Sequence, residues 1–468
     1  MRKTTTLIKN ADVVVTMDAK RAELKGASIL IENGAIIGVG NNLSTADEII
    51  DATGCVVTPG LINTHHHLFQ SLVRGVPAGQ DALLFGWLKT LYPIFQRMEG
   101  EDMYVSAQSG LAELALSGCS LSSDHQYIFP NDVKMEHAIN GAQSIGVRFH
   151  ATRGAMSVGE SNGGLPPDSL VEKESLILKD FERVISQLHD PSQNAMVQVG
   201  LAPCSPFTVS EGLMRDTAAM ALDKNVMLHT HLAENDEDIA YSLEKFGCRP
   251  GEYAERLGWT GNHVWHAHCV KLNSDEINLF ARTKTGVAHC PCSNCRLGSG
   301  IAPVREMRDG GVKVGLGVDG SASNDAGHLL SEARQLLLLQ RVKNGANSMR
   351  AREALEIATL GGASVLNRTD LGSIEIGKRA DIAIWDITGL AAAGAWDPVA
   401  ALVLNGPFNV RDLFVEGKPV VSSGRLANQE EGMIAHLHHS VRNRSITMRM
   451  ILHGMTYDIG NFIIASII

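Results

Sequence analysis

The stretch Val56-Val57-Thr58-Pro59-Gly60-Leu61-Ile62-Asn63-Thr64-His65-His66-His67 is an apolar run that ends in three histidines. Side chains alternate between the two faces of a strand, so His65 and His67 point to one side and His66 points to the other. Two imidazoles are therefore aimed at one point. An isolated pair of this kind is more often part of a polar turn than a pair of ligands, so its interpretation depends on what recurs further along the chain.

Three later apolar runs end in residues of the same kinds. Residues 225–234 contain His229, His231 and Glu234, residues 264–269 contain His268, and residues 312–320 contain Asp319. Imidazole and carboxylate groups together suit a zinc-like divalent ion, and a catalytic site needs about three or four protein ligands and one open position. The set His65, His67, His231 and Asp319 meets this requirement. His268 alone would be interpreted as a core histidine. Because it ends a strand as the other candidate ligands do, we expect it to belong to the site.

The middle of the chain predicts a parallel α/β barrel. Between residues 58 and 368, apolar strand candidates alternate with helical stretches at residues 102–117, 170–187, 211–224 and 327–342. Such alternation over roughly 300 residues favours a parallel sheet, for which a TIM-type (β/α)8 barrel is the favoured closed form. The candidate ligands then lie at strand C-terminal ends, with the histidine pair on the first strand, His231 on the fifth, His268 on the sixth and Asp319 on the eighth.

Both ends of the chain read as short strands separated by glycine and asparagine turns, at residues 1–57 and again at 369–426. We expect them to form one small β-sandwich domain beside the metal-dependent barrel of residues 58–368. Residues 427–468 are an atypical tail that is apolar from residue 446 onward. Arg449, His453 and Asp458 interrupt the apolar stretch, which argues against a membrane span. An unusual read-through and a self-association element both stay open for this tail.

Composition and charge are those of a large soluble enzyme. Of the 468 residues 44% are apolar and 20% are charged, and a net charge of −10 without any block of Lys and Arg offers no basic surface for nucleic acid. No signal-peptide core follows Met1, and the eight cysteines are irregularly spaced, so we expect a cytoplasmic protein with reduced thiols. Cys290, Cys292 and Cys295 lack the second pair of ligands that a structural zinc site needs.

These motifs carry a resemblance to a known family. The order HxH, HxHxxE, a further His and an Asp on successive strand ends resembles the metal-dependent amidohydrolase superfamily, in its cytosine, guanine and chlorotriazine deaminase branch, over residues 7–426. Residues 65–72, 123–127 and 201–207 are most similar to the 8-oxoguanine deaminases. The resemblance implies hydrolytic deamination of a heterocycle, here of 8-oxoguanine and water to urate and ammonia. Guanine, isoxanthopterin and a hydroxylated s-triazine are alternative substrates, whereas a metal-free scaffold would require lost ligands, and the ligand set is intact.

The resemblance also implies a role for each site residue. A divalent ion on the four ligands would lower the pKa of a bound water from ~16 towards ~7. Glu234 would deliver a proton to the ring nitrogen, His268 would orient the water, and Asp319 would accept the proton of the water as well as ligate. The family's two-metal members carry a bridging lysine on the fourth strand, but residues 197–204 contain none. We therefore expect one ion per chain, zinc first and iron second.

Substrate contacts are less well defined by the sequence. Gln70 can both donate and accept a hydrogen bond, which suits the amide edge of a purine or pteridine. Trp87, Tyr92, Arg153 and Cys204 lie in segments that we expect to form loops after strands one, three and four, where ordinary packing is as common as substrate contact. The expected partners are a small heterocyclic substrate and further copies of this chain in a homo-oligomer, with no nucleic acid and no membrane.

Overall fold

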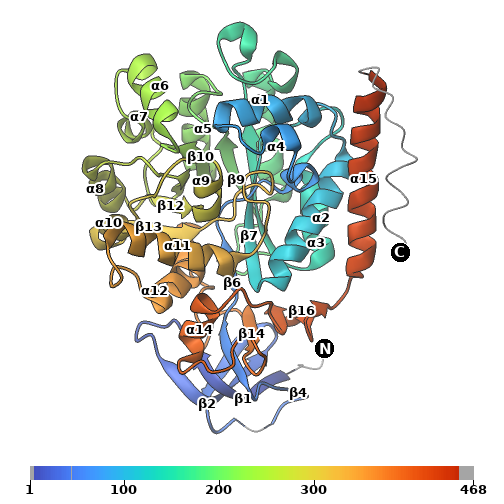
Figure 1. The fold of residues 1–468 in the computed structure, drawn as a ribbon, viewed down its shortest axis with the longest axis vertical. Helices are drawn as coiled ribbons and strands as arrows, with labels where there is room; N and C mark the ends of the chain where they lie inside the picture. Colours follow the sequence, from blue (N-terminus) through green and yellow to red (C-terminus); the bar gives the residue numbers. More distant parts are fainter. Residues whose placement is uncertain (1–4, 44, 453–468) are drawn as a thin grey trace.

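The computed structural model describes residues 5–43 and 45–452, with side chains described as far as residue 444. Eight parallel strands close into a barrel in the order β6-β7-β8-β9-β10-β11-β12-β13 (Figure 1). Their bounds are β6 (Leu61–Asn63), β7 (Cys119–Gln126), β8 (Arg148–Ala155), β9 (Val197–Pro203), β10 (Met227–Leu232), β11 (Val264–His268), β12 (Gly286–His289) and β13 (Lys313–Leu316). The barrel confirms the fold expected from the alternating pattern of the sequence.

Helices connect the strands and surround the barrel. They are α1 (Leu84–Phe95), α2 (Gly100–Leu116), α3 (Met135–Ile145), α4 (Glu174–Leu188), α5 (Glu211–Lys224), α6 (Asp236–Phe246), α7 (Pro250–Arg256), α8 (Ser274–Thr283), α9 (Pro291–Arg296), α10 (Val304–Gly310), α11 (Leu329–Asn344), α12 (Ala351–Glu356) and α13 (Gly362–Val365). The predicted stretch 211–224 coincides with α5, and the other three predicted stretches correspond to α2, α4 and α11. Their apolar faces pack on the strands in one large core.

The connection between β6 and β7 is the long one at the mouth of the barrel. It runs through a short 3₁₀ helix, η1 (Leu68–Val73), and through α1 before α2 begins. Aromatic side chains join these pieces, since Phe69 of η1 packs edge-on against Phe95 of α1 and against Tyr127 beyond β7. In Figure 1 α1 lies over the upper end of the barrel, opposite the end at which the terminal strands gather. This segment therefore forms a wall above the strand C-termini.

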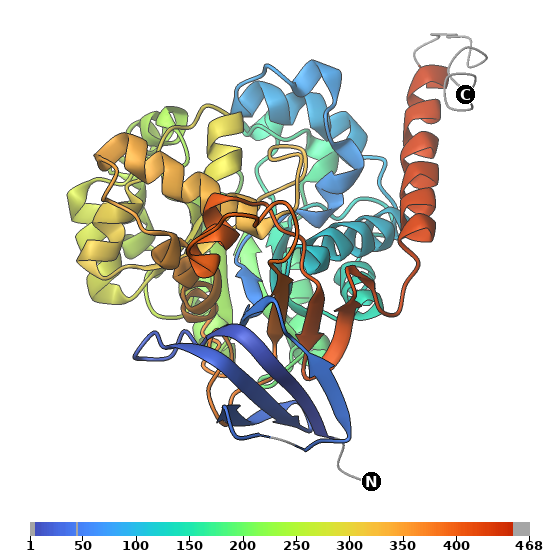
Figure 2. The ribbon, with the colours of Figure 1, turned by 60° about the horizontal axis from the view of Figure 1, so that its bottom comes forward.

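The two ends of the chain come together as expected, and their strands pair into one nine-stranded sheet. The strands β1 (Thr5–Val15), β2 (Glu23–Glu32), β3 (Ala35–Gly40), β4 (Glu48–Asp51) and β5 (Cys55–Pro59) come from the start of the chain, and β14 (Ile382–Asp386), β15 (Asp412–Val415), β16 (Lys418–Ser422) and β17 (Arg425–Leu426) come from its later part. The order is β17-β16-β15-β14-β5-β1-β2-β3, with β4 paired to β1. Figure 2 shows this sheet beneath the barrel. A helix in the same region, α14 (Pro398–Leu404), packs against α11 and α12.

Sheet and barrel are joined at Gly60, the single residue between β5 and β6. A Cβ on Gly60 would lie 2.4 Å from the hydroxyl of Ser120, so only glycine fits this crossing. A buried ion pair holds the same junction: Arg148 at the start of β8 donates two hydrogen bonds to Asp381, at 2.8 and 3.0 Å. Arg148 also contacts Glu416 and donates to the carbonyls of Asn194 and Ala195. The sheet is therefore fixed rigidly to the barrel.

The atypical tail begins with a docked helix, which the sequence did not lead us to expect. Helix α15 (Glu431–Leu452) packs along α2 and η1, with Ile434 and Val441 buried in the contact. The ring of His438 lies 3.1 Å from the hydroxyl of Ser71 in η1. Across the described residues, no helix is both long enough and apolar enough to cross a bilayer. Residues 453–468, the last part of the apolar tail, lie outside the described residues.

Candidate metal centre

The four predicted ligands come together at the C-terminal end of the barrel. His65 and His67 follow β6, His231 lies in β10, and Asp319 follows β13 by three residues. The strand β6 ends at Asn63, yet its continuation keeps hydrogen bonds to both neighbours: the carbonyl of His65 accepts from Asp319 N–H, and that of His66 accepts from His125 N–H. The alternation of faces thus persists through the histidines, and both rings of the HxH pair enter the cluster.

The distances between the ligand atoms fit one small cation. His67 Nε2 lies 3.1 Å from His231 Nε2, and Asp319 Oδ1 lies 3.2 Å from His65 Nε2 and 3.4 Å from His67 Nε2. Four ligands at the ~2.0–2.1 Å distance of zinc are about 3.4 Å apart at the corners of a tetrahedron. Two overlapping groups of candidate ligand atoms, each within 4.8 Å, share His65 and His231; one adds His67 and His125, the other His268 and Asp319.

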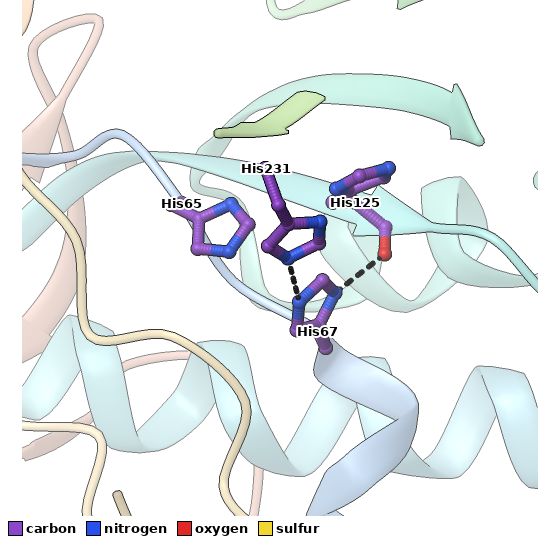
Figure 3. A group of neighbouring side chains, drawn as sticks. All are labelled: His65, His67, His125 and His231. Carbon is purple, nitrogen blue, oxygen red and sulfur yellow. Dashed lines mark hydrogen bonds between the residues drawn. The ribbon is translucent and has the colours of Figure 1, made fainter. Parts of the chain in front are cut away.

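Hydrogen bonds to main-chain carbonyls fix which ring nitrogen of two ligands carries the proton. His67 Nδ1–H donates to the carbonyl of His125 at 2.7 Å, and His231 Nδ1–H donates to the carbonyl of Cys204 at 2.6 Å. Figure 3 shows the first of these bonds and the short approach of His67 to His231. Both Nε2 atoms are therefore unprotonated acceptors that face each other, an arrangement that a cation between them stabilises.

Two successive hydrogen bonds fix which ring nitrogen of His65 carries the proton. His229 Nδ1–H donates to the carbonyl of Trp265 at 3.0 Å, so its Nε2 accepts a hydrogen bond from His65 Nδ1–H at 2.7 Å. The lone pair of His65 Nε2 is left facing Asp319, and this buried atom has no hydrogen-bond partner among the described residues. His125, by contrast, uses its Nε2–H to bond the carbonyl of Ala202. Three imidazole lone pairs and one carboxylate oxygen thus converge.

The protonation states suit a divalent ion as well. Burial lowers the pKa of His65, His67 and His231, so all three rings are neutral at pH 7. Burial opposes ionisation of Asp319, but the imidazoles packed against it, His65 first and then His268, hold the Asp319 pKa well below its usual value. The hydroxyls of Ser293 and Ser323 donate to Asp319 Oδ2 at 2.5 and 3.0 Å, which leaves Oδ1 for an ion. These residues therefore fit one divalent cation.

Glu234 and His268 stand beside the cluster. His268 Nε2 lies 3.7 Å from Glu234 Oε2, and Glu234 Oε1 has no hydrogen-bond partner among the described residues. Burial raises the pKa of Glu234 to about 7. Burial would lower the pKa of His268, but the nearby carboxylates of Glu234 and Asp319 raise it. A carboxyl group with this pKa can both take up and release a proton near neutral pH.

Strained backbone marks the same strand ends. His268 and Asp319 have φ values of 69° and 63°, and Ala233, the residue before Glu234, has a φ of 51°. Left-handed conformations of this kind cost residues other than glycine about 1–3 kcal/mol each and persist where the surroundings demand them. Here they turn the chain sharply, so that each functional side chain faces the cluster directly after its strand.

A cavity with about 490 Å³ of empty space opens onto the cluster. Of the predicted substrate contacts, Gln70, Trp87, Tyr92 and Cys204 line it, together with Tyr127, Ser205, Phe207, Thr208, Leu84, Leu88, Leu297 and Ser323. Gln70 is buried, its Nε2 lies 3.4 Å from the hydroxyl of Tyr127, and its Oε1 has no partner among the described residues. The amide oxygen of Gln70 lies against Gly320, at the wall of the cavity.

Arg153 does not line this cavity. It lies in β8, not in a loop, and its guanidinium pairs with Glu172 at 2.8 Å and with Asp180 at 2.9 Å. The guanidinium also stacks 3.6 Å from the ring centre of Phe129. These contacts explain Arg153 as a side chain that holds the segment after β8 in place. Trp87 and Tyr92 also differ from expectation in lying on a helix, α1, and not in a loop.

Sequence reasoning did not identify several residues that organise the site. His229 orients His65, Ser293 and Ser323 orient Asp319, and Asn294 accepts a hydrogen bond from His268 Nδ1–H at 3.0 Å. Only His229 carried a signal, since it shares a strand face with His231. Ser293 and Asn294 lie in the short helix α9 and Ser323 in the loop after β13, and nothing in their spacing distinguishes them.

Comparisons with known proteins agree with this geometry. The "Amidohydrolase family" profile matches residues 56–420. The 8-oxoguanine deaminase of Pseudomonas aeruginosa is 41% identical over 405 residues, which cover 85% of this chain and 90% of that protein. An isoxanthopterin deaminase from an unknown prokaryotic organism is 38% identical, over 89% of this chain and 92% of its own. The atrazine chlorohydrolase of Arthrobacter aurescens, solved in complex with zinc, superimposes with a TM-score of 0.90 at 33% identity, covering 93% of this chain and 100% of that one. This chain belongs to the amidohydrolase family.

Proposed function

We propose that this protein is a hydrolytic deaminase that converts 8-oxoguanine and water to urate and ammonia with one zinc ion per chain. The observation that carries the proposal is the convergence of His65, His67, His231 and Asp319 on one point with their proton positions fixed for an ion. The similarity to an 8-oxoguanine deaminase at 41% identity supports the choice of ring.

His65, His67, His231 and Asp319 would hold the ion. A zinc ion bound there supplies an acidic water, whose pKa falls from ~16 towards ~7. Strand β9 contains no lysine that could bridge a second ion, so the proposal is for one ion. Zinc is preferred over iron because three imidazoles and one carboxylate suit it and because the structural relative is solved with zinc.

Glu234 moves the protons of the reaction. As a carboxylate it takes one proton from the attacking water, and as a carboxylic acid it gives that proton to the ring nitrogen next to the amino-bearing carbon, C2. A pKa of about 7 allows both steps at neutral pH. Asp319 accepts the remaining proton of the water and passes it to the amino group, which leaves as ammonia, so the atoms balance: C2 gains one oxygen and loses one nitrogen. His268 stabilises negative charge at the attacking oxygen, because its own charge is favoured by the neighbouring carboxylates.

The cavity suits a flat, uncharged heterocycle. Its walls are largely aromatic or aliphatic, with Trp87, Phe207 and Leu297 among them, and such surfaces bind planar rings. The indole N–H of Trp87 already donates to the carbonyl of Ala322, so this side chain contributes its face. Gln70 offers its side-chain amide to the amide edge of the ring. Guanine, isoxanthopterin and hydroxylated s-triazines share an edge of this type and are the alternative substrates.

An ammonia-release assay with several rings tests the proposal. We expect the highest kcat/KM for 8-oxoguanine, weaker turnover of isocytosine because contacts to the missing ring no longer assist the chemical step, and poorer turnover of guanine because polar groups placed for the 8-oxo edge stay unpaired. A preference for guanine, isoxanthopterin or a triazine would overturn the substrate assignment and leave the deaminase chemistry standing.

Elemental analysis tests the metal independently of the ring. We expect close to one zinc per chain in the purified protein and loss of that zinc in His67→Ala. Two equivalents of metal, or a His67→Ala protein that keeps its full content, would show that the ligand set is misassigned.

A further inference from the structure

One buried carboxylate in the described part of the chain is used neither by the metal centre nor by the chemistry proposed above. Glu332 lies in the first turn of α11 and is 1% exposed. Its Oε2 accepts a hydrogen bond from the backbone N–H of Cys292 at 3.1 Å, and its Oε1 accepts one from the side-chain amide of Asn324 at 2.8 Å. These two donors are neutral groups. Burial of a carboxylate without a cation is costly, so its position requires a reason.

The two groups held by Glu332 belong to the two segments that complete the metal centre, which are the first turn of α9 after β12 and the loop after β13. Cys292 lies after β12, and it precedes Ser293, which donates to Asp319, and Asn294, which accepts from His268. Asn324 lies after β13, and the same amide nitrogen that meets Glu332 also donates to the carbonyl of Val318 at 2.7 Å, the residue before Asp319. Through Cys292, Glu332 Oε2 is connected to the neighbouring Ser293, which contacts Asp319. Through the amide of Asn324, Glu332 Oε1 is connected to the carbonyl of Val318, the residue before Asp319.

We propose that Glu332 is a positioning residue that sets the separation of these two segments, and thereby the placement of Asp319 and His268 in the metal centre. The proposal rests on the function proposed above only for the identity of the reaction. Burial raises the pKa of Glu332 to about 7, and the hydrogen bonds from Cys292 and Asn324 favour its ionised form. The physical basis of the proposal is that this form accepts at both oxygens, so Glu332 satisfies two donors, one from each segment. A glutamine there presents one acceptor and one donor, and its NH₂ group faces either the Cys292 N–H or the Asn324 amide without a hydrogen bond.

The same helix provides a comparison about two turns further on. Gln340 is also fully buried, and it too makes two hydrogen bonds: its Oε1 accepts from the N–H of Arg305 at 3.0 Å and its Nε2 donates to the carbonyl of Ala302 at 3.0 Å. Here one donor and one acceptor are needed, and the residue is an amide. Position 332 needs two acceptors, and the residue is a carboxylate. Gln340 holds the start of α10, away from the metal centre.

The experiment compares Glu332→Gln with Gln340→Leu in the zinc-loaded protein. Each change breaks buried hydrogen bonds of α11, so each lowers the melting temperature. For Glu332→Gln we expect kcat to fall on the order of tenfold or more with KM within about twofold, because small misplacement of reacting groups reduces the chemical step. We also expect zinc to be lost to a chelator several times faster than from the unchanged protein, since Asp319 is less well held. For Gln340→Leu we expect both quantities to stay within about twofold.

The zinc-release rate needs no substrate, so it separates failure of this proposal from failure of the substrate assignment. The rate of turnover is measured with whichever ring the ammonia assay shows to be processed. If Glu332→Gln releases zinc and turns over substrate at the unchanged rates, Glu332 does not position the site. If Gln340→Leu at an equal loss of melting temperature shows the same changes in zinc release and kcat, the effect is one of general stability, and the proposal is wrong.

Discussion

Glu234 combines a buried carboxylate, a raised pKa and one unpartnered oxygen, and none of these serves the stability of the fold. Glu234→Gln keeps the shape and removes the transferable proton. We expect this variant to fold, to keep its bound metal and to lose at least ~10²-fold in kcat. The checks are steady-state kinetics together with metal analysis. His268→Ala should likewise lose more rate than metal, because the predicted ligand set does not include it.

The matched control is Glu237→Gln, three residues further on at an exposed position of α6. This change removes one carboxylate charge close to Glu234 in the sequence. It should leave kcat within about twofold of that of the unchanged protein. Normal turnover by Glu234→Gln would move the proton transfer to another group, whereas loss of its zinc would show that the carboxylate ligates the ion.

At this scale the sequence predicted which side chains converge at the barrel mouth but not what orients them. His65, His67, His231 and Asp319 were found because each directly follows an apolar run, and a barrel brings strand ends together. The carbonyls of His125, Cys204 and Trp265 that fix the ring protons leave no trace in the sequence, because every residue has a carbonyl. Arg153 shows the converse: a cation near the site is noticed in the sequence, but its pairing with Glu172 and Asp180 depends on the fold.

Among the elements, helices with clear end signals were predicted best. Helix α5 coincides with its predicted bounds because Ser210 caps its first turn, with its hydroxyl accepting from Leu213 N–H, and because Asn225 ends it in a left-handed conformation. Helix α1 was expected to be a loop. It contains Pro93 in its last turn and no side-chain cap at its start, so the local signals for a helix are weak. Its formation depends on the aromatic contacts above the barrel mouth, which the sequence does not reveal.

The contact between β8 and the terminal sheet yields a prediction about stability. Arg148→Leu leaves Asp381 buried without its cation, and loss of one partner of a buried pair costs about 3–5 kcal/mol. We expect the free energy of unfolding to fall by that amount in a urea titration, while kcat of the remaining folded enzyme is unchanged because the pair lies at the opposite end of the barrel from the metal centre.

The double variant Arg148→Leu/Asp381→Leu is the informative comparison. It removes the unpaired charge and should regain part of the lost free energy of unfolding, since an apolar pair of similar volume fills the same space. A single variant as stable as the unchanged protein would mean that the Arg148 to Asp381 pair does not hold the sheet to the barrel.

For the whole molecule, the many buried histidines predict sensitivity to acid. Among those outside the ligand set, burial lowers the pKa to about 3 for His66, His150 and His289 and to about 4 for His266. Below pH ~6.5 the unfolded chain protonates these rings and the folded chain does not, so the free energy of unfolding falls as pH falls. Each ring contributes up to about 1.4 kcal/mol per pH unit in that range.

Urea titrations of the zinc-loaded protein at pH 7.5, 6.5 and 5.5 measure this effect. We expect little change over the upper interval and a marked loss over the lower one. His150→Leu removes one of these rings, so it should reduce the dependence of the unfolding free energy on pH. The ring of His150 has no hydrogen-bond partner among the described residues, so the change breaks no hydrogen bond. His436→Asn, at an exposed position of α15, should not change it. Equal stability at pH 7.5 and 5.5 would mean that the histidines are not buried as neutral rings.

The central place of β5 in the terminal sheet has a consequence for how the chain is made. Strand β5 lies between β1 and β14, and β14 is synthesised about 320 residues after β5. At ~5–20 residues per second, a ribosome needs roughly 15–65 seconds for that length. During this time one edge of β5 has no partner strand, although the barrel strand that follows it is already emerging. A nascent chain with an unpaired apolar edge is a substrate for chaperones and for aggregation, so the yield of this enzyme should depend on translation speed and temperature more than its final stability would suggest.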